Sequence, residues 1–128
     1  MTRVLLLEDS PDVLHVLQLE LELMGYDIDA STDAATAICA AMRARPDVII
    51  SDLGMPGVDG FEFIRRVRAI PSLASVPAIA LTGTTSDRDV QQALASGFTS
   101  HVLKPVEISE LARRVEQLTS RRLRRKAG

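Results

Sequence analysis

The sequence has a single cysteine and no long apolar run. Because Cys39 is alone, the chain can form neither an intramolecular disulfide nor a cysteine metal cluster, and its alanine-rich surroundings favour a small core residue. No uninterrupted apolar segment approaches the roughly 20 residues that span a bilayer. The apolar stretch 4–7 runs directly into Glu8 and Asp9, unlike a signal peptide. We therefore expect no membrane partner and cytoplasmic residence.

The chain also has little excess charge of either sign. A formal net charge of -2 supplies no general attraction to nucleic acid, so nucleic-acid binding through this domain is not expected. The basic segment 121–126 is interpreted as cations that close the last helix, with a nucleic-acid arm as the alternative. With 128 residues, 46% of them hydrophobic, there is room for one folded domain. We expect a domain over residues 1–120 and a basic tail or linker over 121–128.

Short apolar segments alternate with segments of helical periodicity along the whole chain. Five segments are typical of buried strands: 4–7, 26–30, 48–50, 78–81 and 99–103. The first predicted helix is capped by Ser10, has Asp12 in its first turn to complement the helix dipole, and stops at Gly25. Its predicted apolar face is Leu14, Leu17, Leu21 and Met24. Further helices are predicted over 33–43, 61–68, 87–96 and around 108–118.

This alternation predicts an α/β domain with a mostly parallel sheet covered on both faces. The favoured architecture is a flavodoxin-like, doubly wound (βα)5 fold whose five-stranded parallel sheet has the order 2-1-3-4-5. In that order, ligands bind at the carboxyl ends of the first and third strands, where the winding reverses.

Three carboxylates are expected to meet at that edge. Glu8 and Asp9 follow the first strand, and Asp52 ends the third. Like charges about 4 Å apart repel by about 4 kcal/mol at an effective dielectric constant of 20, so the cluster requires a proton, a cationic side chain or a hard metal ion. A magnesium ion fits best because it prefers oxygen ligands. Thr82 and Lys104 end the fourth and fifth strands and should add a hydroxyl and an ammonium to the same edge.

These residues resemble the receiver domains of bacterial response regulators, the two-component signalling family that includes chemotaxis regulators. The matching stretches are residues 4–9, 47–60, 80–83 and 104–105. The resemblance implies that Asp52 accepts a phosphoryl group from a phosphohistidine on a histidine kinase or a histidine phosphotransfer protein. It also implies that the side chains of Glu8, Asp9 and Asp52, with the backbone carbonyl of Gly54, hold Mg²⁺ or Mn²⁺.

The resemblance assigns roles to the remaining strand ends as well. Lys104 would bind a phosphoryl oxygen, the Thr82 hydroxyl would close on the acyl phosphate, and the Lys104–Pro105 peptide bond would be cis. His101 stands where relatives often have a tyrosine or phenylalanine that swings inward on activation. A histidine there either switches in the same way or is a half-exposed strand residue. The surface of the fourth helix, fifth strand and fifth helix would then change and control a partner or output.

Two positions depart from many relatives, because Gly54 and Thr84 replace larger polar groups and leave the phosphoryl lifetime open. A haloacid-dehalogenase-type phosphatase needs a second aspartate at the Gly54 position, and an acidic loop at 8–12 disfavours a flavodoxin-type phosphate binder. The remaining alternative is a pseudo-receiver that acts only as an interaction module. A receiver catalyses its own phosphorylation and dephosphorylation and is not a conventional turnover enzyme. The cognate kinase and the output stay open.

Overall fold

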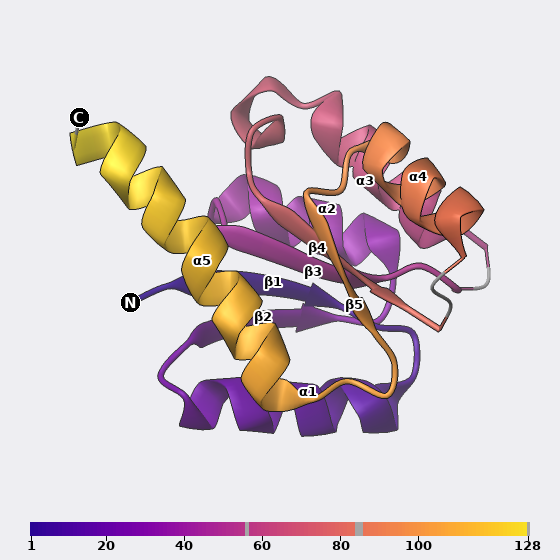
Figure 1. Ribbon diagram of the computed structural model, residues 1–128, viewed down its shortest axis with the longest axis horizontal. Helices are drawn as coiled ribbons and strands as arrows, with labels where there is room; N and C mark the ends of the chain where they lie inside the picture. The colour runs from indigo at the N-terminus through magenta and orange to yellow at the C-terminus, as the bar shows by residue number, and fades with distance from the viewer. Residues whose placement is uncertain (56, 84–85, 128) are drawn as a thin grey trace.

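Five parallel strands form the centre of the fold in the computed structural model, which describes residues 1–55, 57–83 and 86–127, with side chains through residue 120 (Figure 1). The strands are β1 (Arg3–Leu7), β2 (Asp27–Ser31), β3 (Val48–Asp52), β4 (Ala78–Thr82) and β5 (Ser100–Leu103). Their order is β2-β1-β3-β4-β5, and every neighbouring pair is parallel. The predicted fold class and strand order are confirmed.

Helices connect the strands and begin at side-chain caps. They are α1 (Pro11–Leu23), α2 (Ala34–Arg43), α3 (Gly60–Arg68), the 3-10 turn η1 (Pro71–Leu73), α4 (Asp87–Ser96) and α5 (Ile108–Ala127). A side-chain oxygen just before each of the first four α-helices accepts a hydrogen bond from a first-turn backbone N–H. The capping residues are Ser10, Asp33, Asp59 and Ser86. These caps explain why helices start directly after the loops at the carboxyl edge of the sheet.

The sheet is buried on both faces because helices cover both. Alternate residues of β1 point to opposite sides: Val4 and Leu6 belong to one apolar cluster, and Leu5 and Leu7 to the other. The first cluster is completed by α1 and α5, and the second by α2, α3 and α4. Figure 1 shows these two groups of helices on opposite sides of the sheet. The central strands β1, β3 and β4 have almost no solvated face and are therefore mainly apolar, which is why they stand out in the sequence, whereas the edge strands β2 and β5 are partly exposed.

Two predictions about individual side chains are wrong. Cys39 is exposed, because α2 buries Ala34, Ala37, Ala40 and Ala41, and Cys39 lies on the opposite side of that helix. Met24 is 47% exposed, because α1 ends at Leu23 and the chain has already left the helical face. An apolar side chain in an apolar stretch is therefore not enough to predict burial.

Helix α5 continues to Ala127, so the backbone of the basic segment 121–127 is helical. The division of the chain at residue 120 remains a prediction. Among the described residues, none of the helices combines the length and the apolar character that a membrane span requires.

Candidate functional site

The carboxylates predicted to meet at the sheet edge do so. Leu7 and Ser51 are partners in the β1–β3 register, so the residues that follow them, Glu8 and Asp52, leave the sheet side by side. Together with Asp9 they present carboxylate oxygens that all lie within 4.8 Å of one another. Glu8 is 2% exposed and Asp52 4% exposed. Acidic groups packed this closely and this far from water favour a cation between them.

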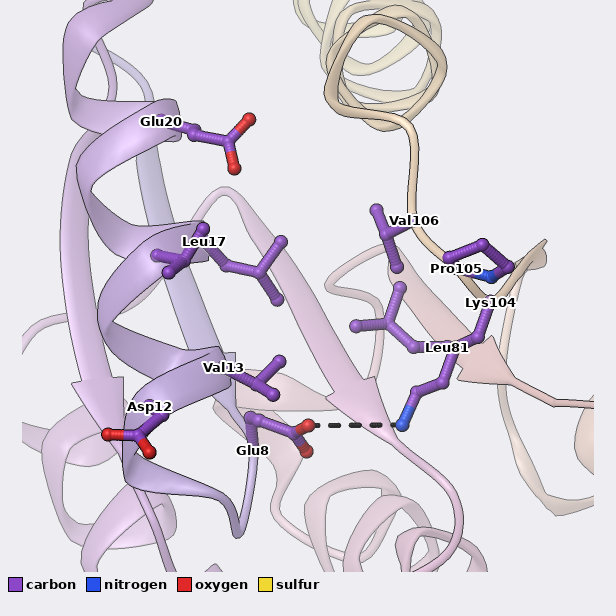
Figure 2. Close-up of a pocket in the computed structure, with 10 residues that line it drawn as sticks. Glu8, Asp12, Val13, Leu17, Glu20, Leu81, Lys104, Pro105 and Val106 are labelled. Carbon is purple, nitrogen blue, oxygen red and sulfur yellow. Dashed lines mark ion pairs between the residues drawn. The ribbon is translucent and has the colours of Figure 1, made fainter.

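One cation already reaches the cluster from β5. The Nζ atom of Lys104 lies 2.8 Å from Oδ1 of Asp52 and 3.8 Å from Oε1 of Glu8, and Figure 2 shows the second contact. The backbone N–H of Lys104 donates to the carbonyl of Thr82 at 2.7 Å, which fixes the end of β5 against β4. The Lys104–Pro105 peptide bond is cis. The ammonium is therefore held at Asp52 from the side of β4 and β5.

The close packing shifts the acid–base properties of two groups. Burial, followed by the hydrogen bond and charge of Asp52, raises the pKa of Glu8 from 4.5 to about 7, and Lys104 only partly opposes this. Burial lowers the pKa of Lys104, but its hydrogen bond to Asp52 and the charges of the three carboxylates outweigh burial, so the net pKa is raised. Lys104 is therefore a cation at neutral pH, while Glu8 exchanges its proton near neutrality.

Backbone contacts hold Asp52 in place, and sequence reasoning missed the residues that make them. The Ser51 hydroxyl is fully buried and donates to the backbone carbonyl of Asp52 at 2.9 Å. Gly60 packs so closely on the backbone of Asp52 and Leu53 that a Cβ there would overlap both. The only sequence signal for Gly60 was its place at the end of a Gly/Pro-rich loop, and Ser51 gave none.

The other predicted residues lie around the same edge. Thr82 is 5% exposed and lines a cavity of about 350 Å³ with Asp52, Gly54 and Lys104. The backbone N–H of Gly54 donates to Oδ1 of Asp52 at 3.4 Å, and the predicted role of its carbonyl stays a prediction. His101 is half-buried on β5, opposite Ala80 in the register, and is not part of the carboxylate cluster. Thr84 lies outside the described residues.

A second hollow lies beside the cluster, between α1 and the segment that follows β5 (Figure 2). Its volume is about 460 Å³, and Glu8 and Lys104 close one end of it. Most of its walls are apolar; the lining side chains of α1 include Val13, Val16 and Leu17, with Asp12 and Glu20 among them. Asp12 is exposed in the first turn of α1, where it was predicted, and is outside the three-carboxylate cluster. The hollow is thus a mainly apolar surface that adjoins the carboxylate cluster at Glu8 and Lys104.

Known proteins share this fold and much of the sequence. The family model described as the response regulator receiver domain matches residues 4–116. The virulence transcriptional regulator PhoP of Salmonella typhimurium is 37% identical over 94% of this chain, which spans only 53% of that regulator.

Two solved structures are similar over almost their whole lengths. Chemotaxis protein CheY4 of Vibrio cholerae is 33% identical with a TM-score of 0.88, over 92% of this chain and 98% of that one. The receiver domain of the sensor histidine kinase PA1611 of Pseudomonas aeruginosa, described with a magnesium ion coordinated in its active-site cleft, is 31% identical with a TM-score of 0.85. That similarity covers 93% of this chain and 98% of the Pseudomonas chain.

Proposed function

The chain belongs to the response regulator receiver domain family of two-component signalling, and on that premise we propose that it accepts a phosphoryl group on Asp52. The donor is a phosphohistidine on a histidine kinase or a histidine phosphotransfer protein. The observation that carries the proposal is the 2.8 Å contact between Lys104 and Asp52 inside a cluster of three carboxylates. The mutual repulsion of these carboxylates is unfavourable when no metal is bound. A divalent cation would offset this repulsion and could at the same time bind an anionic phosphoryl group.

The transfer forms one bond and breaks one. A carboxylate oxygen of Asp52 attacks phosphorus, the O–P bond forms as the P–N bond to the donor imidazole breaks, and the imidazole leaves with the electron pair and takes up a proton. Charge in this reaction spreads over the phosphoryl oxygens, so positioning and electrostatic stabilisation supply most of the catalysis. The chain thereby catalyses its own phosphorylation, and hydrolysis of the acyl phosphate resets it, without the turnover of a conventional enzyme.

The donor set fits a hard divalent cation. Three carboxylates within 4.8 Å of one another offer the oxygen ligands that Mg²⁺ or Mn²⁺ prefers. We assign the ion to the side chains of Glu8, Asp9 and Asp52 and the backbone carbonyl of Gly54. A bound cation would neutralise charge on the phosphoryl oxygens. The magnesium ion described for the similar Pseudomonas receiver domain supports this assignment.

The side chains around Asp52 divide the remaining work. Lys104 binds a phosphoryl oxygen, because its ammonium already contacts Asp52. The Thr82 hydroxyl, which lines the same cavity as Asp52, closes on the acyl phosphate. The position of His101 on the neighbouring strand then changes, and with it the surface formed by α4, β5 and α5. That surface controls an output domain or protein, in a cytoplasmic setting.

The proposed domain spans residues 1–120, with 121–128 as a basic tail or linker, and nucleic-acid binding is not assigned to it. The alternative is a pseudo-receiver that only binds proteins. It is disfavoured because acceptor, acidic pair and lysine are all present and in contact.

Uptake of phosphoryl from acetyl phosphate tests the proposal. The wild-type protein should gain the mass of one phosphoryl group in Mg²⁺ and none in excess chelator, and Asp52→Asn should gain none. Asp12→Asn, which removes a nearby exposed carboxylate, should behave as wild type. A pseudo-receiver would stay unmodified under every condition, and labelling of Asp52→Asn at the wild-type rate would place the acceptor elsewhere.

A further inference from the structure

The guanidinium of Arg68 donates hydrogen bonds to backbone carbonyls at the ends of two neighbouring helical segments. Arg68 is the last residue of α3. Its Nε and Nη2 atoms donate to the carbonyl of Gly97, just past the end of α4, at 3.0 and 2.8 Å. Its Nη1 atom donates to the carbonyls of Leu73 and Ala74, at the end of η1, at 3.1 and 3.2 Å. A cation is favoured at such helix ends, where unpaired carbonyls concentrate partial negative charge.

These hydrogen bonds of Arg68 are not part of a salt bridge among the described residues. Among the described residues, no carboxylate lies within salt-bridge distance of Arg68. Burial lowers the pKa of Arg68 from its ordinary value, which stays far above neutrality for a guanidinium. Only the forked guanidinium has donors spread widely enough to serve three carbonyls at once.

Helix α4 buries little of its own surface. Ala93 is its single buried residue, while Leu94 is 48% exposed. Its first turn, Asp87 to Asp89, is exposed or half-exposed. By contrast, the chain just after the helix is firmly held: Phe98 is 4% exposed, and a Cβ on Gly97 would lie 2.8 Å from Cγ of Arg68. The helix is therefore anchored at its C-terminal end, whereas its first turn is more exposed.

We propose that Arg68 is a pin that fixes the C-terminal end of α4 to α3 and η1, so that α4 moves about this end. Figure 1 shows α3 and α4 as neighbours on one side of the sheet. The pin itself is a property of the unmodified protein. The statement that a change at Thr82 drives the movement rests on the proposed function.

Amide hydrogen exchange of the unmodified protein tests the pin. Arg68→Met keeps the apolar stem and removes the donors, so the amides of residues 94–98 should exchange roughly tenfold faster. The matched control is Arg66→Met, because Arg66 is an exposed arginine of the same helix that pairs only with Glu62 among the described residues. It should change these amides less than about twofold. Equal effects of the two variants, or no effect of Arg68→Met, would overturn the pin.

A milder variant keeps the test decisive if Arg68→Met does not fold. Lys at position 68 retains the charge but cannot reach all three carbonyls together, so Arg68→Lys should still accelerate exchange at residues 94–98 severalfold. Unchanged exchange in Arg68→Lys would contradict the need for the guanidinium fork.

Beryllofluoride, an acyl-phosphate mimic, tests the movement. In the wild type it should shift the amide resonances of residues 87–90 and leave those of 94–97 nearly unchanged, whereas in Arg68→Met both ends should shift. If the resonance shifts are distributed alike over both ends of α4 in the two proteins, the pivot is refuted. Acetyl phosphate labelling separates the two proposals: unlabelled wild type counts against phosphorylation, and the exchange comparison still decides the pin.

Discussion

At the scale of single residues, the site combines one ammonium with three carboxylates, of which Glu8 and Asp52 are buried and Asp9 is half-buried. Lys104 touches Asp52 directly and Glu8 at the edge of ion-pair distance. One positive charge cannot offset three negative ones, so the cluster retains an excess of acid that a divalent cation can satisfy. We therefore expect separable roles, in which the lysine would bind the phosphoryl group and the carboxylates would bind the metal.

Lys104→Ala should separate those roles. The variant loses a cation that competes for the carboxylates, so its Mg²⁺ affinity should equal or exceed that of the wild type, while most of its response to beryllofluoride is lost. A Mg²⁺ titration followed by amide shifts measures both. Asp9→Ala is the comparison, because it should lose Mg²⁺ affinity, and an equal loss in Lys104→Ala would disprove the division.

The raised pKa of Glu8 predicts how Mg²⁺ binding depends on pH. The pKa of Glu8 is about 7 in the folded protein, against 4.5 for an ordinary glutamate. The bound proton therefore stabilises the folded state relative to the unfolded state, and this contribution is fully present below pH 4.5. That contribution is lost as the pH rises through about 7. Mg²⁺ must displace the proton, so its affinity should fall about tenfold per pH unit below pH 7.

Isothermal titration calorimetry with Mg²⁺ checks this dependence. The pH is varied from about 5.5 to about 8.5, a range that brackets the pKa of Glu8. Glu8→Gln has no proton to displace, so its weaker Mg²⁺ binding should lose the steep change near pH 7. The same slope in wild type and Glu8→Gln would assign the titration to another group.

At the scale of elements, the carboxyl ends of the strands that form the site could be predicted from sequence because a short, mainly apolar segment is followed there by a polar residue. Asp52 and Lys104 are examples. Supporting contacts could not be predicted. Ser51 stabilises the backbone through a hydroxyl that sits in an otherwise apolar strand, and the need for Gly60 arises only when α3 packs back on β3. Cys39 was misplaced because small residues occur on both sides of α2.

The outer face of α1 should determine recognition of the phosphodonor. Val13 and Val16 are 43% and 53% exposed, and both line the hollow that ends at Lys104. A glutamate at position 16 would join Asp12 and Glu20 and place a third acid around an apolar contact surface. Val16→Glu should therefore slow transfer from a phosphorylated histidine phosphotransfer protein at least about tenfold.

The control for Val16→Glu is Leu94→Glu, a similarly exposed apolar position on α4. Leu94→Glu should transfer at the wild-type rate, and both variants should label normally with acetyl phosphate, which needs no docking surface. Equal slowing of the two variants would show that α1 has no special part in recognition.

At the scale of the whole molecule, the site exists because the parallel order β2-β1-β3-β4-β5 brings residues 8, 52, 82 and 104 to one edge. Alternating strands and helices predicted a parallel sheet covered on both faces, since apolar strands without a solvated face require helices on both sides. They made this order the leading candidate without fixing it, and the resemblance to receiver domains supported it. The anchoring of α4 by Arg68 was beyond sequence reasoning, because it depends on how α3, η1 and α4 end relative to one another.

Chemical trapping of the acyl phosphate directly tests whether Asp52 is the phosphoryl acceptor. Protein treated with acetyl phosphate and Mg²⁺ is reduced with borohydride, which converts an aspartyl phosphate to homoserine, and is then digested and sequenced by mass spectrometry. Homoserine is expected at position 52 alone, dependent on Mg²⁺ and absent in chelator. Homoserine at any other aspartate would contradict phosphorylation of Asp52. So would a wild-type protein that carries a phosphoryl group elsewhere while position 52 stays unmodified.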